Sequence, residues 1–185
     1  MSTAILEKKK WTYDDYTWLD DDTRYEIIEG ELIMAPAPLT KHQFVSGELE
    51  FLIRTFVKKY NQGKVFDAPT DVVLSPHNVF QPDILFISNE NMGILTEKNV
   101  QGAPDLIVEI LSPGTAVYDM GIKKDVYERA GVRELWILDP ESDTALVYQN
   151  GEKGFEMTGQ AKKKGILKSS VLKGFKVKIE KIFSE

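Results

Sequence analysis

Hydrophobic side chains recur at three- and four-residue steps between residues 40 and 60, the clearest periodic pattern in the chain. The apolar positions are Phe44, Val45, Leu49, Leu52, Ile53, Phe56, Val57 and Tyr60. This spacing places them on one face of an α-helix. Pro38 breaks the chain before this segment, and Gly63 follows its end. We therefore predict a long amphipathic helix over 40–60 that packs across a sheet.

Three short segments are apolar on both faces of a β-strand and predict the buried centre of that sheet. They run over 82–87, 105–111 and 135–138. Weaker strand patterns lie over 25–28, 32–34, 65–74, 144–148, 155–158 and 175–179. The first two form a predicted hairpin that turns near Gly30, and Pro69 interrupts the third. Strands and helices in this order predict an α/β (α+β) fold, with a mixed central sheet flanked by helices.

The length of 185 residues favours one domain with its own hydrophobic core. We predict a single domain over 1–185, divided into an N-terminal helix and hairpin over 12–40, a core over 41–150 and a basic C-terminal β extension over 151–185. The N-terminal helix begins at Thr12, where Thr12 and Asp15 have the spacing of a capping box.

Two carboxylates occupy strands that are otherwise apolar. Glu109 lies in the middle of 105–111, and Asp83 stands at the start of the neighbouring strand. A buried carboxylate has to be protonated, paired with a cation or bound to a metal, because leaving it unpaired costs several kcal/mol. A salt-bridged Glu109 and a turn-capping Asp83 are the structural alternatives. Together the two residues favour a shared site for a hard cation such as Mg²⁺.

A helix is predicted after the second carboxylate strand, from Thr115 to about Ala130, with Gly131 just past its end. Asp119, Lys123 and Tyr127 lie four residues apart and share its inward stripe with Val126 and Ala130. An inward Lys123 close to two carboxylates is either an ion-pair partner or an electrostatic catalyst, and the spacing leaves both open.

Composition and charge narrow the classes of function. Cysteine is absent, which excludes disulfides and thiolate metal sites, and no apolar run approaches a membrane span. We expect a cytoplasmic protein. The net charge is −6, yet residues 151–185 hold nine Lys and four Glu, so that the rest of the chain carries −11. The run Lys162–Lys164 contacts a phosphate backbone or, alternatively, is only a solvated edge.

Several separated motifs resemble the Uma-two family of restriction-endonuclease-like proteins, which belongs to the PD-(D/E)XK nuclease superfamily. They are Pro82-Asp83, the run Glu-Ile-Leu-Ser-Pro over 109–113, the spacing of Asp119, Lys123 and Tyr127, and the run Gly-Val-Arg-Glu-Leu-Trp-Ile-Leu-Asp-Pro over 131–140. They occur in the family's order and cover about residues 12–150. The resemblance implies a restriction-endonuclease-like fold.

The resemblance also implies roles for individual residues. Asp83 and Glu109 would ligate Mg²⁺ or Mn²⁺, and the lysine that the superfamily has two residues later is here Leu111. Lys123, on the following helix, would replace it. Glu26 and His42 match positions that recur in the family, and we treat them with Asp119 and Tyr127 as secondary candidates. DNA would be the substrate, and a homodimer would supply two active sites to cut both strands.

Three hypotheses follow from these patterns. The first is a metal-dependent nuclease that hydrolyses phosphodiester bonds in DNA through Asp83, Glu109 and Lys123. The second is a catalytically inactive module with a nuclease fold that binds nucleic acid or a protein partner, which Leu111 and the acidic balance favour. The third is a purely structural ion-pair cluster.

Overall fold

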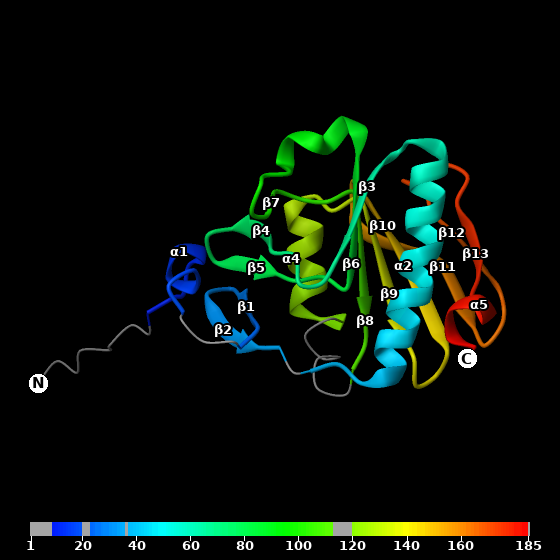
Figure 1. Ribbon diagram of the computed structural model, residues 1–185, viewed down its shortest axis with the longest axis horizontal. Helices are drawn as coiled ribbons and strands as arrows, with labels where there is room; N and C mark the ends of the chain where they lie inside the picture. The colour runs from blue at the N-terminus through cyan, green and yellow to red at the C-terminus, as the bar shows by residue number, and fades with distance from the viewer. Residues whose placement is uncertain (1–8, 20–22, 36, 113–119, 185) are drawn as a thin grey trace, which may run out of the picture.

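A mixed six-stranded sheet forms the centre of the computed structural model, which describes residues 9–19, 23–35, 37–112 and 120–184 (Figure 1). The strand order is β11-β10-β9-β8-β6-β3. The bounds are β3 Gly63–Asp67, β6 Ile84–Ser88, β8 Leu106–Ile110, β9 Glu134–Asp139, β10 Thr144–Gly151 and β11 Gly154–Lys162. Only β8 and β9 pair in parallel, whereas the other neighbours are antiparallel. This confirms the predicted fold class and the pairing of the two carboxylate strands.

Two helices cover opposite faces of the central sheet. Helix α2, Thr40–Tyr60, has the predicted bounds and buries an apolar stripe against alternate residues of β6, β8 and β9, among them Phe86 and Val108. Helix α4, Ile122–Ala130, packs against the intervening residues, such as Ile107 and Ile137. Successive side chains of a strand point to opposite faces, so strands covered on both sides have to be apolar throughout.

Helix α4 differs in part from the prediction. Gly131 ends the helix in the left-handed conformation with φ of 89°, as predicted. Ala130, however, is exposed rather than turned inward, and the buried residues of α4 are Lys123, Val126 and Tyr127. The predicted start at Thr115 lies outside the described residues, and Gly121 stands at the N-cap position of α4.

A second sheet holds the N-terminal hairpin and has the order β2-β1-β5-β4-β7. Its strands are β1 Tyr25–Ile28, β2 Glu31–Met34, β4 Val72–Ser75, β5 Asn78–Phe80 and β7 Val100–Gln101. The hairpin turns at Glu29 and Gly30 as predicted, both with positive φ. The prediction of one strand over 65–74 is wrong, since this segment forms β3 in the central sheet and β4 in the second. Pro69 cannot donate a ladder hydrogen bond, and the chain leaves the central sheet there.

The remaining elements border these sheets. Helix α1, Tyr13–Tyr16, begins with the predicted capping box of Thr12 and Asp15. The 3₁₀ segment η1, Asn89–Ile94, follows β6. Strands β12, Ile166–Lys168, and β13, Lys176–Lys178, pair with each other, and the short helix α5, Glu180–Phe183, follows. Their apolar side chains join the cluster under α2, and no described helix is long and apolar enough to cross a membrane.

Candidate active site

The antiparallel pairing of β6 and β8 brings the two carboxylates together. Ile84 pairs with Val108, so the same register places Asp83, one residue before β6, opposite Glu109. Directly opposed residues point to the same face of a sheet. Both side chains line a pocket of about 120 Å³ at this end of the two strands, where Glu109 is buried and Asp83 is partly exposed.

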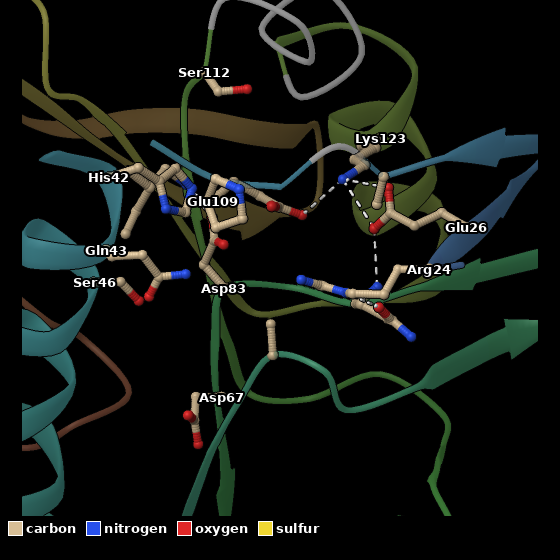
Figure 2. Close-up of a pocket in the computed structure, with 15 residues that line it drawn as sticks. Arg24, Glu26, His42, Gln43, Ser46, Asp67, Asp83, Glu109, Ser112 and Lys123 are labelled. Atoms are coloured by element: carbon tan, nitrogen blue, oxygen red, sulfur yellow. Dashed lines mark hydrogen bonds and ion pairs between the residues drawn. The ribbon is translucent and has the colours of Figure 1, made fainter. Parts of the chain in front are cut away.

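Lys123 reaches this pocket from α4 and lies between two carboxylates (Figure 2). Its Nζ is 2.8 Å from Oε2 of Glu26 and 3.6 Å from Oε1 of Glu109. All three side chains are buried, with 4–7% of each residue exposed. Glu26, which comes from β1, is therefore the closer partner of the lysine. The buried charge of Lys123 is compensated by both carboxylates, as buried ions require.

Tyr127 contacts the same carboxylate from one helical turn further along α4. Its hydroxyl donates to Oε1 of Glu109 at 2.5 Å, and its ring packs edge-on against Phe80. Residues four apart lie on one helix face, so Lys123 and Tyr127 approach Glu109 side by side. Asp119, predicted on this stripe, lies outside the described residues.

His42 enters the pocket from the first turn of α2. Its Nε2 is 3.3 Å from Oδ2 of Asp83, and the same oxygen accepts a hydrogen bond from the backbone N–H of Ile110 at 2.7 Å. Gln43 and Ser46 line the pocket beside His42. The structure thus brings Asp83, Glu109, Lys123, Glu26 and His42 to one pocket, with Tyr127 behind Glu109.

Several pocket residues were missed by the sequence analysis, and two of them, Arg24 and Gln81, form a connected pair. Gln81 donates its backbone N–H to Oε1 of Glu26 at 2.9 Å, and its side-chain oxygen accepts from Nε of Arg24 at 3.0 Å. Both residues line the pocket. Arg24 stands one residue before β1 and Gln81 lies between β5 and β6, so strand alternation gave no signal for either residue.

Asp71, on the far side of Gln81, belongs to the support of the site and does not line the pocket. Its Oδ1 accepts from Nε2 of Gln81 at 2.9 Å. Burial raises the pKa of the Asp71 carboxyl, and the hydrogen bond from Gln81 opposes that shift.

Comparison with protein families identifies the chain. Residues 12–180 match Uma2, which is described as "Putative restriction endonuclease". The chain belongs to the Uma2 family. A crystal structure of "a putative nuclease belonging to DUF820" from Anabaena variabilis ATCC 29413 has the same fold, with a TM-score of 0.76. It is 22% identical, and the alignment covers 94% of this chain and 97% of that one. No curated protein matches the sequence.

The charges of the Uma2 pocket suit a hard cation. Four carboxylates line it, from Glu26, Asp67, Asp83 and Glu109. Lys123 pairs with Glu26 and Glu109, and Asp67 pairs with Arg54. Oδ1 of Asp83 has no partner among the described residues. Carboxylate oxygens are the ligands that Mg²⁺ and Mn²⁺ prefer, and Mg²⁺ often uses only one or two of them. The described residues contain no cluster of three or more His, Cys, Asp or Glu side chains arranged around a metal position. The site therefore fits a cation that also takes ligands from water and substrate.

Proposed function

We propose that the protein is a metal-dependent nuclease that hydrolyses phosphodiester bonds in DNA. One observation carries the proposal: Asp83 just before β6, Glu109 of β8 and Lys123 of α4 converge on a single pocket. Membership in a family described as "Putative restriction endonuclease" and the fold shared with "a putative nuclease" support it.

Asp83 and Glu109 would hold the metal ion. Mg²⁺ or Mn²⁺ bound there would supply an activated water and polarise a phosphoryl oxygen. The contacts around the pair keep the two carboxylates in place: Asp83 is held by the Ile110 N–H and Glu109 by the Tyr127 hydroxyl. In Asp83 the accepting oxygen is Oδ2, and in Glu109 it is Oε1.

Lys123 would stabilise the negative charge that develops on the phosphate. Its ammonium is held between the carboxylates of Glu26 and Glu109. This environment suits electrostatic stabilisation better than the removal of a proton from water. Leu111, at the position where the superfamily has lysine, packs with the cluster under α4 instead. Lys123 approaches Glu109 from that same face.

A second candidate function is a nuclease-fold module that binds nucleic acid or a protein without cutting. The closer contact of Lys123 with Glu26 than with Glu109 favours it, since a lysine engaged in a buried ion pair is less available to substrate. For the nuclease, we further propose a homodimer, because cutting both strands of a duplex requires two sites of this kind.

The test is a cleavage assay on labelled single-stranded and duplex DNA with Mg²⁺, Mn²⁺ or EDTA. Wild type should cut only with a cation, and Asp83→Asn or Glu109→Gln should each lower the rate at least about a hundredfold, because metal ligation contributes several kcal/mol to such reactions. Asp125→Asn, an exposed carboxylate on α4, serves as the matched control and should cut like wild type.

Circular dichroism has to show that each variant folds. Wild type that binds DNA yet leaves every substrate intact with either ion would exclude the nuclease and support the non-cutting module. Equal cleavage by wild type and Glu109→Gln would exclude this site.

A further inference from the structure

Arg24 holds a half-buried positive charge in the pocket and has no carboxylate partner within the described part of the chain. Its Nε donates to Oε1 of Gln81, but its two terminal amino groups donate to no atom of the described residues. Glu26 and Asp83 line the same pocket, yet neither forms an ion pair with Arg24. In Figure 2 the Arg24 side chain extends from the β1 side toward the middle of the pocket.

Gln81 keeps Arg24 in this orientation. Three bonds fix Gln81 itself: its N–H donates to Glu26 at 2.9 Å, and its side-chain amide donates to Asp71 at 2.9 Å and to the Tyr16 hydroxyl at 3.3 Å. The remaining amide oxygen accepts from Arg24. A guanidinium is planar, so holding Nε also fixes the direction of the two terminal groups. Arg24 thus presents a preorganised pair of donors.

We propose that Arg24 binds a phosphate group of the nucleic-acid strand, with its terminal amino groups on the non-bridging oxygens, and that Gln81 is its positioning residue. A guanidinium matches phosphate geometry with two parallel hydrogen bonds. Polar side chains of Gln43 and Ser46 line the pocket as well, from α2. The inference rests on the proposed function, since it names what holds the substrate beside Asp83 and Glu109.

The test is the binding of a fluorescein-labelled oligonucleotide, followed by anisotropy in Ca²⁺, with a gel to verify that the strand stays intact. Arg24→Gln should weaken binding about tenfold for every sequence tested and lower the slope of log K against log salt by about one. Arg24→Lys retains the positive charge and most of the packing but lacks the planar pair of terminal donors, so the affinity of this variant for the oligonucleotide should be intermediate. It also serves if Arg24→Gln does not fold.

Arg129→Gln is the matched control, because Arg129 is exposed and pairs with Glu29 outside the pocket. It should bind like wild type. Oligonucleotides with a single neutral methylphosphonate identify the contacted phosphate: the modification at that position should weaken wild type but not weaken Arg24→Gln any further, since the two changes remove the same contact. This distinguishes the scissile phosphate from a neighbouring one.

Equal affinity and salt slope for wild type and Arg24→Gln would overturn the inference, as would wild type that binds neither the oligonucleotide nor inorganic phosphate. The cleavage assay above decides the proposed function separately. Binding through Arg24 without cleavage would leave the inference intact and refute the nuclease. Cleavage with no contribution from Arg24 would do the reverse.

Discussion

At the scale of single residues, the buried ion pair of Lys123 with Glu26 is the contact whose loss should lower the stability of the fold most. Lys123→Met retains the apolar stem but leaves Glu26 and Glu109 without their cation. Removing one partner of a buried pair strands the other charge, so we expect the free energy of unfolding to fall by about 3–5 kcal/mol, measured by urea denaturation.

The double variant Glu26→Gln with Lys123→Met is the control for this prediction. Neutralising both partners removes the stranded charge of Glu26, so the double variant should regain part of the lost stability. A single variant as stable as wild type would show that Lys123 contributes little to the fold. Any loss of cleavage in Lys123→Met would then come from the catalytic step and not from a loss of folding.

Site residues could be predicted where a charged side chain stands in an otherwise apolar pattern. Glu109 stood out because every neighbour in its strand is apolar, and Lys123 because its helix stripe led toward that strand. Arg24 and Glu26 could not be ranked in the same way. Glu26 lies in a short hairpin strand and Arg24 stands just before it, and only the docking of the hairpin on the central sheet buries Glu26.

At the scale of elements, the boundaries of the helices depend on local backbone chemistry that sequence conveys well. Gly131 ends α4 at φ of 89°, where a β-carbon would meet no described atom within 4 Å. Gly131→Ala should therefore cost only the backbone strain of a left-handed alanine, about 1–2 kcal/mol. Lys123 lies at the other end of α4, so cleavage should stay at the wild-type rate.

Gly47→Ala is the matched comparison, in which the free energy of unfolding should change in the opposite direction. Gly47 lies on the exposed side of α2, and a β-carbon there also meets no described atom. Alanine in a helix interior should raise the free energy of unfolding by about 0.5–1 kcal/mol. Urea denaturation measures both variants, and a change of the same sign in the two would contradict the assignment of strain to Gly131.

Which sheet a strand joins could not be predicted from its own pattern. Residues 65–74 look like one interrupted strand, but β3 pairs with β6 in the central sheet while β4 pairs with β5 and β7. Pairing depends on contacts far apart in sequence, which periodicity does not encode. The buried strands were predicted correctly because burial on both faces leaves a signal in every residue.

At the scale of the whole molecule, one end of the central sheet gathers both the pocket and a run of lysines. Glu109 pairs with Ile137 of β9, and the same row continues through Leu146 to Gln160 of β11. Three strand steps correspond to about 15 Å. Lys162 lies two residues beyond Gln160 at the same end, and Lys162, Lys163 and Lys164 are all exposed.

This placement predicts that the lysine run contacts DNA held in the pocket. The triple change of Lys162, Lys163 and Lys164 to Gln should weaken DNA binding about tenfold or more. It should also lower the slope of log K against log salt by about two to three, because fewer counterions are released when phosphate contacts are lost.

The control is the triple change of Lys58, Lys59 and Lys64 to Gln. These exposed lysines lie near the opposite end of α2, a helix of 21 residues that spans about 31 Å. Both triples change the net charge equally, so the comparison separates position from charge. If the two weaken binding alike, the run over 162–164 is only a solvated edge of the sheet. A loss confined to the first triple would place the DNA across the end of the sheet, from the pocket to β11.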